Sequence, residues 1–476
     1  MGYIGLLTYT LIVFLFFYSV EKEKYRIAFW VCILLALYLR IWICSDPFLH
    51  VFDERYHALV AKHLLYYGEP LLYANPILEH NSADWTQCEV WLHKPPLPLL
   101  FIAASLKLFG LSVYAVRMPS IIFSMLTCVL TYRICLHLFH RRIALIAFFL
   151  HAIHGLSIEL VGGRVSSDHT DVFYLFFVEL ALYLVIVKKK NPLIILVTSF
   201  ILLFAFLSKW IAVFIPVLII SIYFIIYRVD RMKHILFYFL STLFIGISYL
   251  AFVSVYPDEV NQVFSGIMEL VTDEKSPHQG GAFYYINRIR IIYGELIYIP
   301  LLMATYSVMK YRCRLKDQAF ILLWIMAPLI LMSFLDAKRA TYSLVFAPAV
   351  FILSSYYYYV FRHLCFRNKR VKRIICFLIM VLIIALPIRY NIERMKFFSE
   401  YSENRVKSKS IELITNIDSF DHKNTIVIDE EFAIEFMFYH NLPAYHNRLT
   451  LTEISKLNAE GKVLVKRYEN RLMNVE

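Results

Sequence analysis

Apolar runs long enough to cross a membrane follow one another along most of the chain, with short polar segments between them. A membrane-spanning helix needs roughly 17–25 mostly apolar residues. By that measure the pattern predicts an all-α, multi-pass membrane protein with about twelve transmembrane helices. We place these helices near residues 3–20, 27–45, 113–138, 143–161, 171–187, 192–208, 210–227, 235–255, 291–309, 318–335, 341–361 and 374–389.

Two large polar loops interrupt the apolar pattern, at residues 46–98 and 256–290. Within and just after the first, residues 56–67 carry apolar side chains at helical spacing, and residues 97–111 form an apolar run too short to cross a bilayer. Helices of this kind lie in the membrane interface. We therefore predict interfacial helices that cover a cavity at the membrane surface.

The composition turns polar from about Tyr390 onward. The short runs TIVID and KVLVK are typical of strands, and helical patterns lie near residues 431–439 and 451–457. The chain is thus expected to divide into a transmembrane domain, residues 1–389, and a small soluble extracytoplasmic α/β domain, residues 390–476.

Composition and charge agree with a membrane protein. The chain is 60% hydrophobic, with a mean hydropathy of +0.61. A net charge of +12 would also suit a nucleic-acid-binding protein, but the basic residues lie in short loops between the predicted spans. Such loops mark a cytoplasmic face, so we expect no nucleic-acid partner. The eight cysteines are scattered without a CxxC pair, which argues against a disulfide framework or a zinc site.

The positive-inside rule gives the chain one consistent topology. Every alternate loop from the third span onward is basic: Arg141 and Arg142; Lys188–Lys190; Arg228, Arg231 and Lys233; Lys310, Arg312, Arg314 and Lys316; and the cluster from Arg362 to Arg373. The remaining loops then face the outer side, together with the C-terminal domain. The first apolar run lacks a preceding basic segment, so we interpret it as a span that enters from outside rather than as a signal peptide.

The outer side nevertheless holds both carboxylates and cations, where positive-inside topology should leave few charges. Single residues have structural explanations: an acid can cap a helix, and a lysine can reach toward lipid headgroups. Their gathering on one face favours a functional set. Its members are Asp53, Glu54, His93, Lys94, Arg164, Asp168, His169, Asp171, Lys209, Glu274, Lys275, His278, Lys338, Arg339 and Tyr342.

Such a set suits transfer from a lipid-linked phosphate. A carboxylate can accept the proton of an attacking hydroxyl group, and cations can stabilise the charge that develops on the leaving phosphate. A sugar carried on a polyprenyl phosphate needs both at a membrane boundary, without a nucleotide site. The sequence contains no glycine-rich phosphate loop.

Several motifs resemble the GT-C glycosyltransferases, in particular the bacterial protein O-mannosyltransferases and lipid A aminoarabinose transferases. FDERYH followed by HKPPLPLLFIAASLKLFGLSVYAVRMPS is similar to their first outer loop, and RVSSDHTDVFYLFF to their second acidic motif. FLSKW, HQGGAFYY and KRATYSLVFAPA look like later motifs of the family. The likeness covers roughly residues 27–361, and a soluble C-terminal domain is a feature of the aminoarabinose branch.

The resemblance implies a role for each matching residue. Asp53, beside Glu54, would be the general base or would position the acceptor, and Asp171, with Asp168 as its rival, the second acidic residue. Lys94 and Lys209 would bind the lipid phosphate. Further donor contacts are assigned to Tyr342, Lys338, Arg339 and Arg164, and a divalent metal ion, if one is used, to His278 and His93.

The sequence departs from the family pattern at three places. His93 stands where relatives often have Glu, Trp210 follows Lys209 in place of Gly, and one extra span precedes the acidic loop.

We expect an inverting, polyprenyl-phosphate-dependent glycosyltransferase of a bacterial inner membrane, with an extracytoplasmic active site and a lipid A, protein or glycan acceptor. The other classes considered are a lipid or sugar flippase, which would carry charges at mid-span, and a non-catalytic scaffold.

Overall fold

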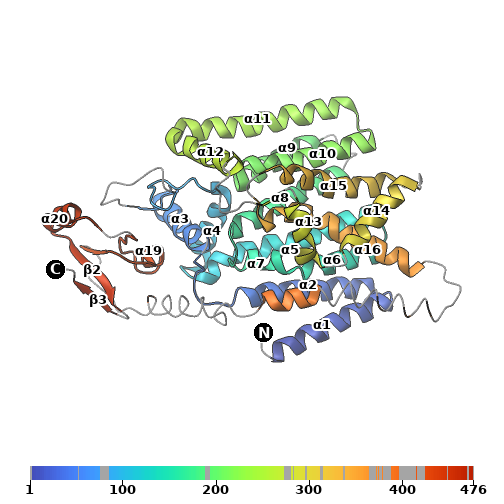
Figure 1. Ribbon diagram of the computed structural model, residues 1–476, viewed down its shortest axis with the longest axis horizontal. Helices are drawn as coiled ribbons and strands as arrows, with labels where there is room; N and C mark the ends of the chain where they lie inside the picture. Colours follow the sequence, from blue (N-terminus) through green and yellow to red (C-terminus); the bar gives the residue numbers. More distant parts are fainter. Residues whose placement is uncertain are drawn as a thin grey trace. The chain divides into compact units, whose positions relative to one another are not determined.

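The computed structural model is mainly helical (Figure 1). It describes residues 3–51, 53–74, 85–187, 193–272, 280–281, 283–294, 297–310, 315–335, 338–363, 371, 374, 378, 387–395, 414, 424–446, 449–468 and 471–474. The chain forms two compact units. The first comprises residues 1–43, 120–162 and 170–395, and the second comprises residues 44–119, 163–169 and 396–476.

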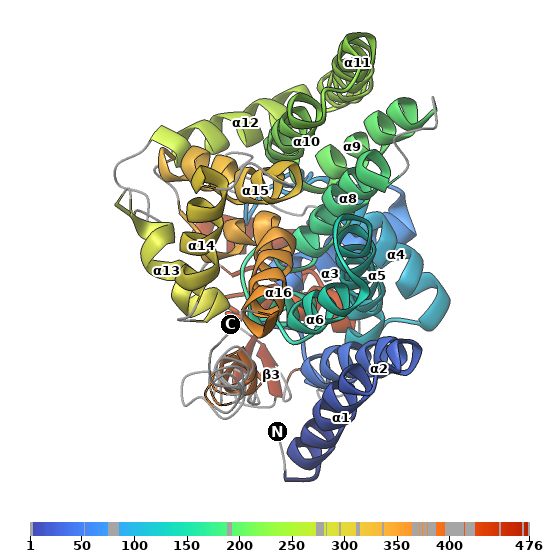
Figure 2. The same ribbon diagram turned by 90° about the vertical axis from the view of Figure 1, so that its right-hand side faces the viewer.

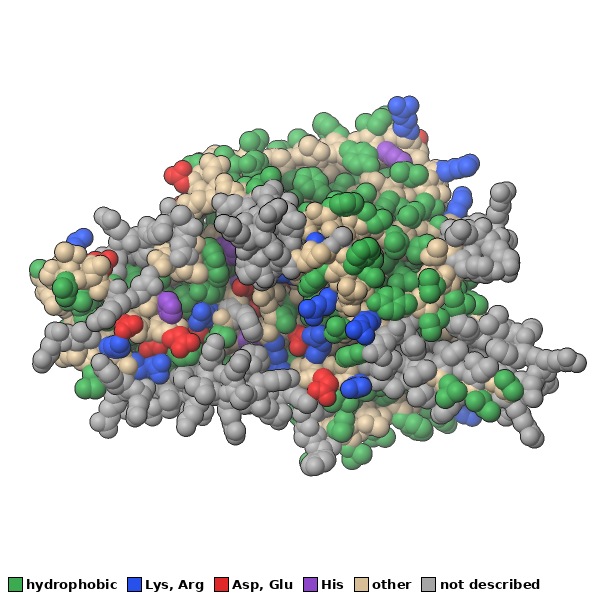
Figure 3. Space-filling view, in the orientation of Figure 1, with side chains coloured by type: hydrophobic (Ala, Val, Ile, Leu, Met, Phe, Trp, Pro, Cys, Tyr) green, Lys and Arg blue, Asp and Glu red, His purple; other side chains and the backbone are tan. Residues whose placement is uncertain are grey.

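The first unit is a bundle of apolar helices (Figure 2). Its helices are α1 (Tyr3–Glu21), α2 (Tyr25–Ile43), most of α5 (Val113–Leu138), α6 (Arg141–Ala152), α7 (Gly155–Val161), most of α8 (Asp168–Val187), α9 (Ile194–Lys209), α10 (Phe214–Tyr227), α11 (Arg231–Val255), α12 (Pro257–Thr272), α13 (Tyr284–Tyr293), α14 (Tyr298–Lys310), α15 (Leu315–Ser333) and α16 (Ala347–His363). Hydrophobic side chains cover much of the visible surface of α11 and its neighbours, as a lipid-facing surface requires (Figure 3).

Eight helical segments of the described chain are long and apolar enough to cross a membrane, or nine if the bent pair α6 and α7 counts as one span. A multi-pass membrane protein is therefore confirmed. The two spans predicted at 192–208 and 210–227 form one continuous apolar segment in this count, Ile194–Tyr227. The span predicted at 374–389 lies largely outside the described residues.

Burial of Arg40 accompanies the 54° bend between α6 and α7. Its guanidinium donates to the carbonyl oxygen of Ala152 at 3.1 Å and to Ser124 Oγ at 2.8 Å. Ala152 ends α6, where a carbonyl loses its helical partner. Arg40 thus satisfies a backbone group that the bend would otherwise leave unpaired inside the bundle.

The second unit joins the first large polar loop, residues 46–98, to the C-terminal region. Helix α3 (Asp53–Tyr67) packs against α4 (Pro96–Phe109) and against α19 (Ala433–His440). Helices α3 and α4 overlap the segments 56–67 and 97–111 that were predicted to lie at the interface. One face of α4 buries Leu99, Ile102 and Leu106, whereas Leu100, Phe101 and Leu108 are exposed on another.

A small sheet follows in the C-terminal region. Strand β1 (Thr425–Val427) pairs in parallel with β2 (Val463–Tyr468), which pairs antiparallel with β3 (Arg471–Asn474). Helix α20 (Leu451–Ala459) starts with a capping box between Thr450 and Glu453. These elements confirm the small α/β region expected there.

Candidate functional site

The adjacent carboxylates Asp53 and Glu54 begin α3 but point into different surroundings. Neighbouring residues of a helix point about 100° apart. The Glu54 side chain has no exposed surface, whereas 15% of the Asp53 side chain is exposed. The two acids therefore have different roles, and the surroundings of each acid indicate which role it has.

Glu54 forms a buried bidentate ion pair with Arg117 of α5. Arg117 Nε lies 2.7 Å from Oε1, and Nη2 lies 2.9 Å from Oε2. The backbone N–H of His50 donates to Oε2 at 2.7 Å. Burial alone would raise the pKa of Glu54, but Arg117, His169 and His50 outweigh it and hold the pKa well below its usual range.

Arg117 also fixes the backbone that leads into α3. Its guanidinium donates to the carbonyl oxygens of Cys44, Asp46 and Phe48 at 3.1, 2.6 and 2.7 Å. Gly163 packs directly against the Glu54 carboxylate. Its φ is +70°, and a Cβ there would lie 2.4 Å from Glu54 Cδ, so only glycine fits at this position. Glu54 and Arg117 together therefore set the position of the first turn of α3.

Asp53 holds its carboxylate where a reactant can approach. Its Oδ2 accepts the backbone N–H of Ser167 at 2.8 Å and lies 3.2 Å from Lys94 Nζ. Ser167 reaches it with a φ of +64°, which is costly for a residue with a side chain. Among the described residues, none donates a hydrogen bond to Oδ1.

Its neighbours also keep Asp53 ionised. Burial would raise the pKa of Asp53, yet Lys94, His57 and the Ser167 N–H lower it well below the usual range. The carboxylate is therefore deprotonated at neutral pH.

Asp168 is fully buried and binds a histidine that the sequence analysis did not select. Its Oδ1 lies 2.8 Å from His57 Nδ1. His57 stands one turn after Asp53 on α3, and its Nε2 is buried without a hydrogen-bond partner in the described part of the chain. Spacing i, i+4 from an acid on a helix is the signal that could have pointed to His57. Arg117 lies near the end of the family-like stretch HKPPLPLLFIAASLKLFGLSVYAVRMPS, but no residue close to it in sequence indicated that Glu54 is its partner.

Arg164, predicted to contact the donor, lies in the same unit. Its Nη2 binds Asp46 Oδ2 at 2.6 Å, and both side chains are almost fully buried. Asp46 in turn lies 3.4 Å from His50 Nε2. Arg164 thus braces the segment before α3.

A second cluster, within the first unit, surrounds Lys209 at the end of α9. Lys209 Nζ forms an ion pair with Asp171 of α8. The ammonium also lies 4.8 Å from the ring centroid of Tyr342 and 5.8 Å from that of Tyr174. The Lys209 side chain is 24% exposed. A cation held by one carboxylate and two aromatic rings, yet reachable from outside, can bind an anion.

The remaining candidates are placed as follows. Lys338 is buried and donates to the carbonyl oxygen of Gly280, whereas Arg339 is partly exposed. The ring of His93 stacks on Trp85 with centroids 4.6 Å apart. Glu274, Lys275 and His278 lie outside the described residues. Within the described part of the chain, no three His, Cys, Asp or Glu side chains gather to hold a metal ion.

The comparisons with known proteins agree with this architecture. Residues 93–255 match the family model described as dolichyl-phosphate-mannose-protein mannosyltransferase. No curated protein matches the sequence significantly.

Three solved structures illustrate the likeness. ArnT from Cupriavidus metallidurans in the apo state has a TM-score of 0.63 at 13% identity, covering 92% of each chain. The same ArnT bound to undecaprenyl phosphate has a TM-score of 0.63 at 14% identity, covering 90% of this chain and 87% of that one. The oligosaccharyltransferase AglB from Archaeoglobus fulgidus, in complex with an inhibitory peptide and a dolichol-phosphate, has a TM-score of 0.58 at 13% identity, with coverages of 94% and 69%.

These likenesses define the class of the protein: it is a multi-pass membrane protein with the GT-C fold. The partial match to the family model and the shared fold agree with the resemblance seen in the sequence, to glycosyltransferases of the ArnT and protein mannosyltransferase type.

Proposed function

We propose that the protein transfers a sugar from a polyprenyl-phosphate donor to a hydroxyl-bearing acceptor, with inversion at the anomeric carbon. The observation that carries the proposal is the partly exposed, ionised carboxylate of Asp53, which Ser167 and Lys94 orient and which receives no hydrogen bond at Oδ1 from the described residues. Support for the donor comes from the ArnT and AglB structures, which hold undecaprenyl phosphate and a dolichol-phosphate.

In the proposed step, Asp53 accepts the proton of the acceptor hydroxyl group as its oxygen attacks the anomeric carbon. A new glycosidic bond forms while the bond between that carbon and the phosphate oxygen breaks. The electron pair stays on the oxygen, and polyprenyl phosphate leaves with a developing negative charge. Cations placed at that oxygen stabilise the transition state. Glu54, Arg117 and Asp168 position α3 and do not touch the reactants.

Lys209 is assigned to the phosphate of the donor. The ion pair with Asp171 and the rings of Tyr342 and Tyr174 together fix the position of the Lys209 ammonium group. Asp171 thus keeps the lysine in place rather than acting as a base. Lys94 forms an ion pair with Asp53 and so contributes positive charge beside the proposed base.

Substitution of Lys209 by alanine is expected to weaken binding of a polyprenyl phosphate by roughly 1.5–3 kcal/mol, the value of a charge-assisted hydrogen bond. That corresponds to about 10–150-fold in dissociation constant. Isothermal titration of undecaprenyl phosphate into the detergent-solubilised chain measures it. The exposed Lys107 of α4, replaced in the same way, is the matched control and should leave affinity unchanged. Equal affinity of the Lys209 variant and the wild type would remove Lys209 from the phosphate site.

For localisation we propose the inner membrane of a bacterial-type cell, with the second unit on the outer side. The basic ends of the helices support this orientation. Single cysteines at the exposed positions Glu69 and Lys456 are expected to react with an impermeant thiol reagent in intact cells. A cysteine at the exposed Arg231 should react only after permeabilisation, each measured above the background of the native cysteines. Labelling of Arg231 and Glu69 from the same side would contradict the topology.

A flippase is not favoured by the charged residues inside the spans. Arg40 is bound to backbone carbonyls and Ser124, and Glu179 accepts a hydrogen bond from Thr131 at 2.6 Å. Both side chains are buried among packed helices. Their surroundings resemble structural contacts rather than the lining of a transport path.

A further inference from the structure

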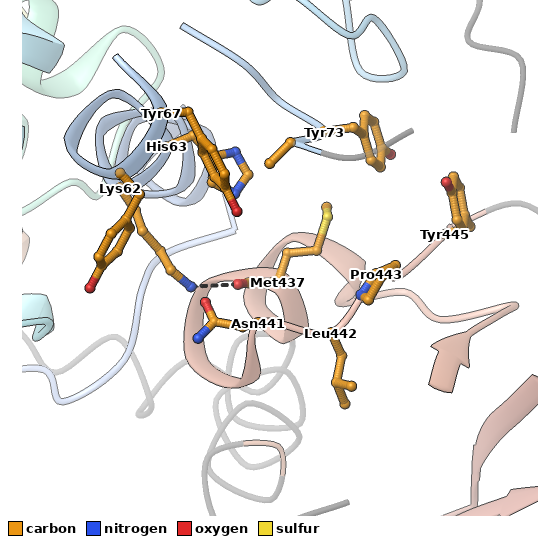
Figure 4. A pocket seen from close by; sticks show the side chains of 11 residues that line it. Lys62, His63, Tyr67, Tyr73, Met437, Asn441, Leu442, Pro443 and Tyr445 are labelled. Atoms are coloured by element: carbon orange, nitrogen blue, oxygen red, sulfur yellow. Dashed lines mark hydrogen bonds between the residues drawn. The ribbon is translucent and has the colours of Figure 1, made fainter. Parts of the chain in front are cut away.

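A pocket lies within the second unit, where the end of α3 faces the segment that follows α19 (Figure 4). Its volume of about 110 Å³ is several times the roughly 10–15 Å³ that one water molecule needs in a cavity. The pocket therefore has room for a small ligand such as one sugar ring.

Tyrosines form much of the wall. Tyr73 and Tyr445 are almost fully buried and stack on each other, with ring centroids 5.5 Å apart and planes 8° from parallel. Tyr66 and Tyr67, by contrast, are 61% and 52% exposed at the end of α3. Buried rings thus give the pocket a fixed wall, while exposed rings border its entrance. Tyrosine offers an apolar ring face together with a polar hydroxyl group, which suits the C–H face and hydroxyl groups of a sugar.

Hydrogen-bonding groups stand between these rings. Lys62 Nζ donates to the carbonyl oxygens of Met437 and Phe438 at 2.7 and 2.6 Å, which uses two of its three N–H groups. His63 donates through Nδ1 to the carbonyl oxygen of Leu71 at 2.9 Å. Burial lowers the pKa of His63 to about 4, so Nε2 remains an acceptor at neutral pH. Asn441 adds an exposed amide.

The charge of Lys62 does not require an anionic ligand. The carbonyls that it binds belong to the last turn of α19, where the helix dipole is negative and favours a cation. A phosphate placed beside that helix end would meet the same negative potential. The pocket therefore favours a neutral, hydroxyl-rich ligand.

We propose that this pocket binds one neutral sugar unit of the acceptor. The identification of that sugar as part of the acceptor rests on the proposed glycosyl transfer, whereas binding of a sugar to the pocket does not. The acceptor is then a glycan or glycolipid that docks in the second unit, which also carries Asp53. A competing role for Tyr66 and Tyr67 is to anchor the chain at the membrane interface.

The test measures binding of neutral methyl glycosides to the full chain in nanodiscs by saturation-transfer NMR. The panel consists of methyl hexosides and methyl N-acetylhexosaminides. Tyr67→Ala removes one exposed ring. Asn441→Gly removes the amide at a φ of 56°, which glycine adopts without cost. Tyr114→Ala is the control, because Tyr114 is 54% exposed and outside the pocket.

At least one glycoside is expected to bind, and each pocket variant should weaken it about tenfold while Tyr114→Ala leaves it unchanged. Absence of binding across the panel, or equal binding by the pocket variants and the wild type, overturns the proposal. Glycoside binding by a chain that never releases polyprenyl phosphate would reject the transfer reaction alone, and release without glycoside binding would reject the pocket alone.

Discussion

Asp53→Asn should lower the rate of sugar transfer by about 10²–10⁴-fold, the usual loss when a general base is removed. Asparagine keeps the size of the side chain and can still accept the N–H of Ser167, but it cannot take a proton. Binding of the donor should be unchanged and the chain should still fold, although loss of the ion pair with Lys94 lowers its stability. Turnover of a synthetic polyprenyl-phosphate sugar, measured beside donor affinity, separates the two effects. Glu89→Gln is a matched control, because Glu89 is an exposed acid of the same loop.

A second measurement links Asp53 to Lys94. Lys94 lowers the pKa of Asp53, so Lys94→Ala should raise that pKa toward the ordinary value of 3.8. The acid limb of the pH–rate profile, where the base becomes protonated, should then move to higher pH. Near-wild-type turnover of Asp53→Asn, or an acid limb that does not move in Lys94→Ala, would show that Asp53 is not the base.

Glu54→Gln should have the largest effect on stability, with a loss of roughly 3–5 kcal/mol in the free energy of unfolding. The substitution leaves the guanidinium of Arg117 fully buried without its bidentate partner. The double variant Glu54→Leu, Arg117→Met removes both charges and should recover part of that loss. Chemical denaturation in detergent gives the free energy of unfolding of the wild type, of Glu54→Gln and of the double variant, with Glu89→Gln again as the control.

The pH dependence gives an independent check of the same pair. The pKa of Glu54 is lower in the folded state than its ordinary value of 4.5. Its contribution to stability is therefore complete above about pH 4.5 and is lost as the pH falls toward the folded pKa. The difference in stability between wild type and Glu54→Gln should shrink over that range. A constant difference down to pH 3 would mean that Glu54 is not ionised in the folded protein.

The sequence predicted most of the long apolar helices because each has a local signal, but the count of about twelve spans is not confirmed: the described residues hold eight such segments, or nine with the bent pair α6 and α7. Apolar runs indicated the spans, and the strands at TIVID and KVLVK and the two helices near them had the expected alternation and periodicity. The order of the motifs FDERYH and HKPPLP indicated the fold family before any contact was known. These signals lie within short stretches of chain.

The different environments of Asp53 and Glu54 could not be predicted in the same way. Which of two adjacent acids is buried depends on Arg117, 63 positions later in the chain. Likewise, the two aromatic rings beside Lys209 belong to different helices, and neither carries a local mark of its partner. The grouping of the first large polar loop with the C-terminal region was not predicted for the same reason, because contacts between α3 and α19 join segments far apart in sequence.

Release of polyprenyl phosphate from a synthetic polyprenyl-phosphate sugar by the purified chain tests the central claim most directly. Membrane extract supplies the acceptor, and lipid chromatography separates donor from product. The account predicts release with wild type, coupled one-to-one to sugar appearing on an acceptor, and release lower by about 10²-fold or more with Asp53→Asn. Equal release by wild type, Asp53→Asn and a preparation without the protein, across the donor sugars offered, would contradict it.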